Sequence, residues 1–435
     1  MWQSNGAGRA RRSEQSLGLT WRCGRVGATL ASVAAAGSML LGCETTGSGS
    51  GSGSSGSVSS GTAVEEIDPG TPVPEQREPS PAPARVASES GSERPDRPAA
   101  APERDDEMSD LMRGLDERYL VSPLVASDFG YRLDWQSTFP DRLIEMMRPQ
   151  GDVVMLLWSG NFLTRVEAGS GSATWDLPVG QADERMLGIT FDPATGKMFV
   201  TTEGALLELD GSNGGLMNRR RLQEIAATKP VSFGRSMIYG ARNGQVAWVS
   251  FDTAYQYQAY AIDQTISVPP QVFGDLVVAV GSSGRVVALD AASAQQFWNK
   301  RLLDAVVSPP AIDNRAVYVS GMDQYVRAYD INTGRKYWHY FTDSELTASP
   351  VVIGDRLFQM VPTRGLMCFE SLPRNAPGGE VLWTTPDVTG QVITQHGEDV
   401  FVWDDEARVL TVLSAGRGRV KARYDLPGVV LLEST

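Results

Sequence analysis

The sequence has few of the residues on which catalytic and metal sites depend. Its 435 residues include only three cysteines and two histidines. The cysteines are Cys23, Cys43 and Cys368, and their wide separation excludes the ligand spacing of a zinc site. A G-x-S-x-G elbow and a phosphate-binding P-loop are also missing. We therefore predict no catalytic residue, no cofactor-binding residue and no metal ligand.

Basic residues are in deficit as well. Lysine and arginine total 39 against 52 acidic residues, which gives a formal net charge of −13. Proteins that bind nucleic acid cluster Lys and Arg on one face, so we expect no nucleic-acid partner. The acidic excess is typical of a soluble surface. An acidic patch that receives a basic partner is the alternative interpretation.

Hydrophobic runs long enough to span a bilayer are lacking at the N-terminus. The uncharged apolar run of residues 27–42 has 16 residues, whereas a spanning helix needs about 20. A basic region precedes this run, and small residues end it, which is typical of a signal peptide. The basic region contains Arg9, Arg11, Arg12, Arg22 and Arg25.

The run ends in Leu40-Leu41-Gly42-Cys43, which resembles the lipobox of bacterial lipoproteins. The resemblance implies cleavage after Gly42 and attachment of fatty acyl chains, such as palmitate, to Cys43. We therefore predict a signal peptide over residues 1–42 and a lipid anchor on Cys43, with the rest of the chain in the periplasm. Glu44, rather than Asp, follows the cysteine and favours the outer membrane. The alternative is an ordinary hydrophobic segment that happens to contain a cysteine.

A polar stretch follows the predicted anchor. Residues 43–107 are rich in Gly and Ser and then in Pro, and they have no apolar periodicity, so we predict a disordered tether. In the next segment, 108–130, apolar residues at helical spacing predict a short helix and lead-in. These residues are Met108, Leu111, Met112, Leu115 and Tyr119. The helix could dock on the following domain or bind a partner.

A unit of about forty residues repeats over the rest of the chain. In the clearest copy, residues 306–338, Asp330 precedes Trp338 by eight residues. The same spacing separates Asp290 from Trp298 and Glu167 from Trp175. Short β-rich runs bracketed by turns precede each acidic residue. We expect the Asp330 side chain to cap the following turn and the tryptophan to wedge between neighbouring sheets.

The segment from Ala328 to Trp338, Ala-Tyr-Asp-Ile-Asn-Thr-Gly-Arg-Lys-Tyr-Trp, resembles the repeat of PQQ-like, or quinoprotein-type, β-propellers. The copy that ends at Trp298 has Ala294 in place of the glycine, and the units at 187–222 and 227–263 lack the tryptophan. The resemblance covers about residues 140–428. It implies an all-β fold over residues 131–435, a β-propeller of four-stranded blades stacked around an axis.

Strand starts near residues 143, 187, 229, 268, 307, 348 and 391 favour seven blades, with eight as the alternative. Residues 131–139 form an extra outer strand in this interpretation, and residues 429–433 form an extra inner strand. The two could meet and close the ring.

Quinone-dependent dehydrogenases of this family have an adjacent cysteine pair, a calcium site and a catalytic Asp. This chain has no adjacent cysteines, so we expect that it is not an enzyme. It is more similar to the propeller lipoproteins of the outer-membrane β-barrel assembly machinery, although its tether is longer. That resemblance implies a monomeric, non-catalytic scaffold that binds envelope proteins. A module that binds envelope glycan or a small ligand in the central funnel is the alternative, and a quinone-dependent dehydrogenase is a third, weaker one.

Overall fold

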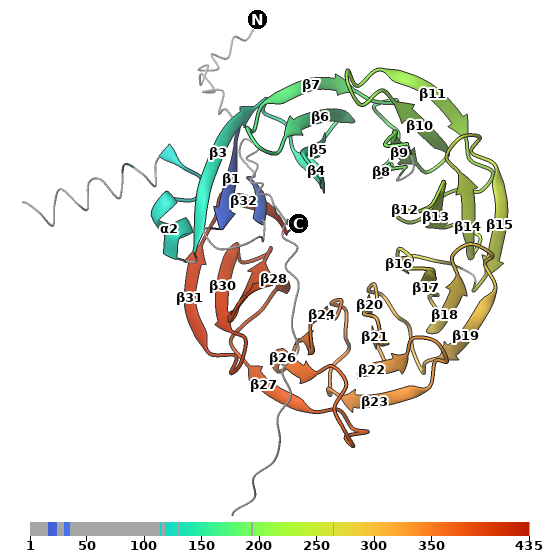
Figure 1. Ribbon diagram of the computed structural model, residues 1–435, viewed down its shortest axis with the longest axis vertical. Helices are drawn as coiled ribbons and strands as arrows, with labels where there is room; N and C mark the ends of the chain where they lie inside the picture. Colours follow the sequence, from blue (N-terminus) through green and yellow to red (C-terminus); the bar gives the residue numbers. More distant parts are fainter. Residues whose placement is uncertain are drawn as a thin grey trace, which may run out of the picture. The chain divides into compact units, whose positions relative to one another are not determined.

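The structure is a computed structural model that describes residues 16–23, 30–34, 114, 118–128, 130–192, 195–263 and 265–434. These residues form a ring of antiparallel β-sheets (Figure 1). Cys43 and the predicted tether lie outside the described residues, as does most of the predicted helix at 108–119. Tyr119, the last residue of that predicted helix, packs against the core. A short helix, α2 (Pro123–Asp128), leads into the ring, and no helix among the described residues is long and apolar enough to span a membrane.

Seven sheets are blades made of four strands that follow one another along the chain. Blades 1 to 3 consist of β4 (Ile144–Gln150), β5 (Val153–Trp158), β6 (Phe162–Glu167) and β7 (Ala173–Pro178); β8 (Met186–Phe191), β9 (Met198–Thr202), β10 (Ala205–Leu209) and β11 (Leu216–Arg221); and β12 (Val231–Phe233), β13 (Ser236–Gly240), β14 (Gln245–Ser250) and β15 (Gln256–Ala261). Blades 4 and 5 consist of β16 (Gln271–Phe273), β17 (Leu276–Val280), β18 (Arg285–Asp290) and β19 (Gln296–Arg301); and β20 (Ala311–Ile312), β21 (Ala316–Ser320), β22 (Tyr325–Asp330) and β23 (Lys336–Phe341). Blades 6 and 7 consist of β24 (Val351–Ile353), β25 (Arg356–Val361), β26 (Gly365–Glu370) and β27 (Val381–Thr385); and β28 (Gln391–His396), β29 (Asp399–Asp404), β30 (Val409–Ser414) and β31 (Val420–Asp425). The predicted fold class and the predicted strand starts are confirmed.

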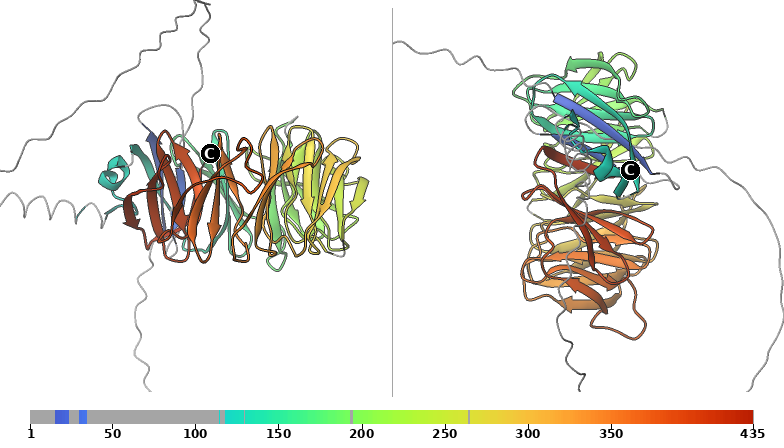
Figure 2. Two further views of the ribbon diagram at one scale, coloured as in Figure 1. Left: turned by 90° about the horizontal axis from the view of Figure 1, so that it is seen from below. Right: turned by 90° about the vertical axis from the view of Figure 1, so that its left-hand side faces the viewer.

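The first strand of each blade lies nearest the axis and the fourth lies on the rim (Figure 1). The second and third strands are covered on both faces, as in β17, where all five residues of Leu-Val-Val-Ala-Val are buried. Rim strands such as β15 alternate between half-buried and exposed positions because only one face is covered. Apolar clusters of the core join neighbouring blades, as when Trp248 of blade 3 packs with Leu289 of blade 4. Figure 2 shows these sheets edge-on.

The repeated acidic residue caps the turn before the rim strand, as the sequence predicts. In blade 5, the Asp330 carboxylate accepts hydrogen bonds from the backbone N–H groups of Asn332 and Thr333 at 3.2 and 2.8 Å. Gly334 has a φ of 64°, which glycine adopts without steric cost. Ala294 takes the same place in blade 4 with a φ of 54°, a conformation that strains a residue with a Cβ.

The tryptophans of the outer strands join their sheets to the next blade in the closing sheet and in blades 1, 4, 5 and 6. The indole Nε1 of Trp338 donates a hydrogen bond to the carbonyl of Ser371 at 2.7 Å, across the blade 5–blade 6 boundary. The other indole–carbonyl pairs are Trp135 with Ala168, Trp175 with Gly211, Trp298 with Ile331, and Trp383 with Ala415. In every pair the residue that supplies the carbonyl directly follows the acidic position of its repeat, or the equivalent position. The predicted wedge is therefore confirmed, and it is a specific link as well as an apolar contact.

Blade 3 lacks a rim tryptophan but keeps the link by another route. Trp248 lies on β14, the third strand, and donates its indole N–H to the carbonyl of Ala291 at 2.8 Å. Its cross-strand partner on the rim is Gln258, whereas Trp298 of blade 4 lies opposite Ala288. The tryptophan lies on the third strand instead of the rim strand, so an equivalent hydrogen bond is made in a unit where the sequence repeat is broken.

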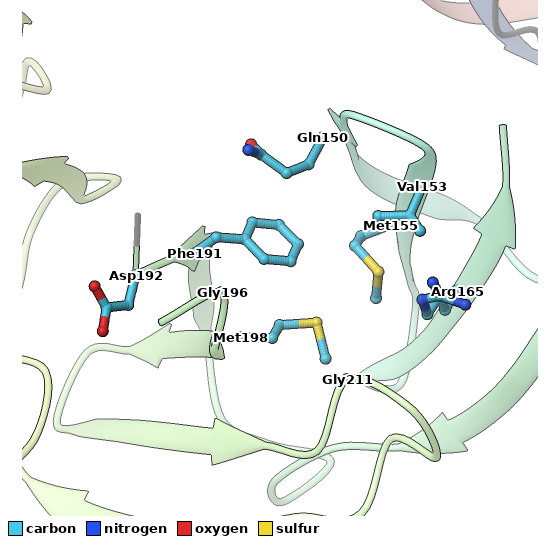
Figure 3. Close-up of a pocket in the computed structure, with 9 residues that line it drawn as sticks. All are labelled: Gln150, Val153, Met155, Arg165, Phe191, Asp192, Gly196, Met198 and Gly211. Carbon is cyan, nitrogen blue, oxygen red and sulfur yellow. The ribbon is translucent and has the colours of Figure 1, made fainter. Parts of the chain in front are cut away.

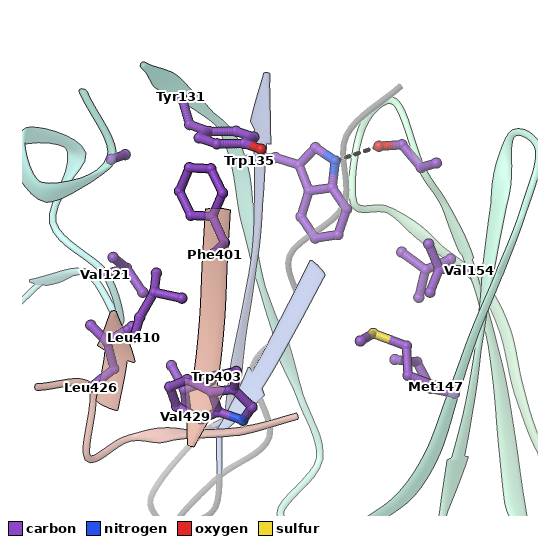
Figure 4. Packing of buried hydrophobic residues seen from close by; sticks show 14 of the residues in the cluster. Val121, Tyr131, Trp135, Met147, Val154, Phe401, Trp403, Leu410, Leu426 and Val429 are labelled. Atoms are coloured by element: carbon purple, nitrogen blue, oxygen red, sulfur yellow. Dashed lines mark hydrogen bonds between the residues drawn. The ribbon is translucent and has the colours of Figure 1, made fainter. Parts of the chain in front are cut away.

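An eighth sheet closes the ring. Its strand order is β3 (Tyr131–Phe139), β1 (Ser16–Cys23), β2 (Leu30–Ala34) and β32 (Val429–Ser434). The two predicted extra strands, β3 and β32, therefore both belong to the closing sheet, but they do not pair with each other. Apolar side chains of blade 7, including Phe401 and Trp403, and of blade 1, including Met147, line the two sides of this sheet (Figure 4). The cleavage predicted after Gly42 would remove both middle strands.

Candidate functional site

The one cysteine of the propeller blades is a core residue. Cys368 lies on β26 and is fully buried. Burial raises the pKa of its thiol to about 12. Because the thiolate is the reactive form, such a cysteine is unreactive near neutral pH. The prediction that Cys368 acts as a small buried hydrophobe is confirmed, while the predicted lipidation site, Cys43, lies outside the described residues.

The two histidines lie in different parts of the ring. His339 is on the rim strand β23, and His396 is on the inner strand β28, where its ring lies 6.4 Å from that of Tyr131. Burial lowers the pKa of His339, with help from the nearby charges of Lys336 and Arg327. No group of three or more metal-ligating side chains occurs among the residues that the structure describes.

Turns divide between the two faces of the ring because the strands of each blade run alternately up and down. The turns between first and second strands share one face with the turns between third and fourth strands. Recesses open on this face where two blades meet, and they bring together residues that are distant in sequence.

One recess, of about 450 Å³, lies between blades 4 and 5, and we call it the apolar recess. Its apolar lining comes from Phe273, Leu276, Phe297 and Ile331. The two phenylalanine side chains are 40% and 51% exposed, and they lie together in one recess, so they form a contiguous apolar surface. Asp275 and Asn332 also line this recess. A pocket with aromatic walls and a few polar groups suits an apolar side chain of another molecule.

A second recess, of about 380 Å³, lies between blades 1 and 2 (Figure 3). The ring of Phe191 and the thioethers of Met155 and Met198 point into it, and Arg165 lies at one side. Met155 and Met198 are almost fully buried, so this recess offers less accessible apolar surface than the apolar recess.

The central channel contains a cavity of about 530 Å³, larger than either recess. The inner strands β4, β8, β12 and β16 contribute to it, together with the loops that precede β12, β16 and β20. The polar residues of its wall are Arg148, Gln150, Thr190, Lys229, Ser232 and Gln271. No sequence motif marks these residues, because each blade supplies only one or two of them.

The channel wall carries a positive pair and one nearby acid. Lys229 is exposed toward the channel. Desolvation by the surrounding wall lowers the pKa of its ammonium, as does the nearby positive charge of Arg148. Burial raises the pKa of Glu433, while the charges of Lys229 and Arg148 oppose that rise. The three groups therefore lie close enough to influence one another's charge.

Comparison with known proteins agrees with the propeller repeat. Residues 232–372 match the family described as outer membrane protein assembly factor BamB. The crystal structure of BamB from Moraxella catarrhalis matches with a TM-score of 0.54 at 20% identity, over 65% of this chain and 86% of that chain. The computationally designed Ika8 protein matches with a TM-score of 0.54 at 13% identity, over 65% and 87%. No curated protein matches the sequence.

A designed protein matches this fold as well as a natural BamB does. The structural likeness therefore establishes the architecture alone, and the function has to be argued from the residues of the candidate sites. The family match runs from blade 3 into blade 6, and it identifies the repeat there as PQQ-like. The chain therefore carries a PQQ-like β-propeller that resembles the propeller of BamB.

Proposed function

We propose that the protein is a lipid-anchored, non-catalytic scaffold of the bacterial cell envelope that binds other proteins, with outer-membrane protein assembly as its process. The family match and the fold support the process. The signal peptide and lipobox of the sequence support the anchor on Cys43 and a periplasmic propeller, with the outer membrane favoured. The roughly sixty residues of the tether would let the propeller work about 40–50 Å from the membrane.

The apolar recess is the observation that carries protein binding. Aromatic side chains are enriched in protein interfaces, and Phe273 and Phe297 present two of them in one apolar recess. Both lie at a blade boundary held by the Trp298 indole, which donates to the Ile331 carbonyl at 2.9 Å. A rigid frame of this kind lowers the entropic cost of binding.

Affinity purification from solubilised envelopes tests this proposal. The acylated native protein should enrich a reproducible set of envelope proteins, and Phe297→Ser should lose them. Truncation of an interface hot spot costs about 2 kcal/mol or more, roughly a thirtyfold loss of affinity. Phe341→Ser is the matched control, because Phe341 is 48% exposed on the rim of the next blade and does not line the recess. Equal enrichment by all three proteins, or none by the native one, would contradict the proposal.

A small-ligand module is the second candidate, and the central channel favours it. The channel cavity has the volume of a small-molecule site, and its wall mixes apolar side chains with a few convergent polar groups. Protein binding at the apolar recess and ligand binding in the channel use different residues, so the two functions are compatible.

A further inference from the structure

The wall of the central channel holds two buried polar atoms without a hydrogen-bond partner. These atoms are the Thr190 hydroxyl oxygen and the Arg148 Nε. Thr190 is only 4% exposed, and both side chains line the same cavity. Most buried polar groups in native proteins have a partner, because leaving one unpaired is destabilising. An acceptor inside the channel would satisfy both groups.

The charge of the wall indicates the sign of that acceptor. Arg148 and Lys229 line the cavity, and Glu433 is a carboxylate close enough to interact with both of these charges. Two cations against one carboxylate leave a local positive charge in a chain whose formal net charge is −13. Positive charge enclosed by protein attracts anions more strongly than the same charge on an open surface.

We propose that Arg148, Thr190 and Lys229 form a site in the central channel for an oxyanion, either a carboxylate or a phosphate group. The Arg148 guanidinium presents a planar set of donors that matches two oxygens of such a group. The Thr190 hydroxyl donates one hydrogen bond, and the Lys229 ammonium neutralises the remaining charge. This site gives the second candidate function its ligand class and does not depend on protein binding at the apolar recess.

The cavity is larger than a bare ion needs. Its volume of about 530 Å³ lies within the range of small-molecule sites, and Phe191, Val231 and Val272 supply apolar surface beside the cations. The amides of Gln150 and Gln271 supply further donors and acceptors on the same wall. The site therefore suits a molecule with an anionic head group and an apolar or mixed body.

Calorimetric titration of the purified full-length protein with sodium phosphate and with sodium acetate tests the site, with sodium chloride at equal ionic strength as the reference. Phosphate, acetate or both should bind in excess of chloride. Arg148→Gln and Lys229→Gln should each weaken this binding roughly tenfold or more, since a hydrogen bond to a charged group contributes about 1.5–3 kcal/mol. Lys336→Gln, which removes the same charge from the rim strand β23, should bind as the native protein does.

Thr190→Val keeps the shape of the side chain and removes only the hydroxyl. In chloride it should melt at the native temperature or above it, because it removes an unpaired buried hydroxyl, and it should lose affinity for the oxyanion. Loss of affinity without loss of stability separates binding from folding. Binding of phosphate alone would identify a phosphate ligand, and binding of acetate alone would identify a carboxylate ligand. Equal response to all three salts, or unchanged affinity in Arg148→Gln and Lys229→Gln, would overturn the proposal. Failure of the protein-binding proposal would leave these results unaffected.

Discussion

The tryptophan link between blades is a strong stabilising contact, and Trp338→Ala tests how strong it is. The Trp338 side chain is 1% exposed, and its ring stacks on Phe369 with the centroids 5.7 Å apart. Its indole donates to the Ser371 carbonyl at 2.7 Å. The neighbouring Gly379 leaves room for the ring, since a Cβ at that residue would lie 3.0 Å from the indole.

Replacing a buried aromatic residue by alanine costs about 3–5 kcal/mol, mostly from the cavity left behind. In a domain of this size, 1 kcal/mol corresponds to about 2 °C in melting temperature, so Trp338→Ala should lower it by about 6–10 °C. Trp338→Phe retains part of the packing but leaves the Ser371 carbonyl without its donor, which costs about 1–3 kcal/mol. Its melting temperature should therefore lie between those of the native protein and of Trp338→Ala.

Differential scanning calorimetry measures all three proteins under the same conditions. The order native, Trp338→Phe, Trp338→Ala is the expected result. A melting temperature of Trp338→Ala within about 2 °C of the native value would refute the reasoning. That result would mean that the blades hold together without the link and that the repeated tryptophan serves another purpose.

Two further predictions concern the turns and the closing sheet. The pKa of Asp330 lies below its ordinary value of 3.8, chiefly because the Tyr337 hydroxyl and then the Thr333 hydroxyl donate to it; its stabilising contribution is therefore present above about pH 4 and is lost as the pH falls through the lowered pKa. The melting temperature should fall on acidification below about pH 4 and should fall less in Asp330→Asn, and a flat profile down to about pH 2.5 would contradict this. Protein that begins at Cys43 lacks β1 and β2, the two middle strands of the closing sheet. Its comparison is the full chain with Cys43→Ala, which cannot be acylated and is kept unprocessed in the cytoplasm. The shorter protein should bind more of a hydrophobic dye, because it exposes the apolar walls of that sheet. Equal dye fluorescence would show that the walls of the closing sheet are covered in both proteins.

The blades were predictable because the interactions that define them lie within one unit of about forty residues. Asp330 caps a turn three residues long, and Trp338 lies eight residues further on, so the repeat records both contacts directly. Trp248 shows the limit of that reasoning. Its ring reaches the next blade from the third strand, opposite Gln258, so a search for tryptophan on the rim strand misses it.

The closing sheet could not be derived in the same way, because its strands come from opposite ends of the chain. β3 and β32 have strand-like sequences, and both were predicted to be strands. Their pairing with β1 and β2 depends on contacts that span most of the chain, and residues 16–34 have the composition of a signal peptide. One segment thus fits two patterns, an export signal and a pair of strands, and the periodicity of the blades cannot decide between them.

The candidate sites were hidden from the sequence for a geometric reason. Arg148 and Lys229 are about eighty residues apart, and Phe273 and Ile331 about sixty. Each pair lines one cavity only because the blades repeat the same path around the axis. Any position on an inner strand or a turn therefore has a neighbour one period away. A binding residue in such a fold is surrounded by its equivalents in other units, and its role shows only in how it differs from them. On this criterion the pair of cations, Arg148 on β4 and Lys229 before β12, is the departure that matters.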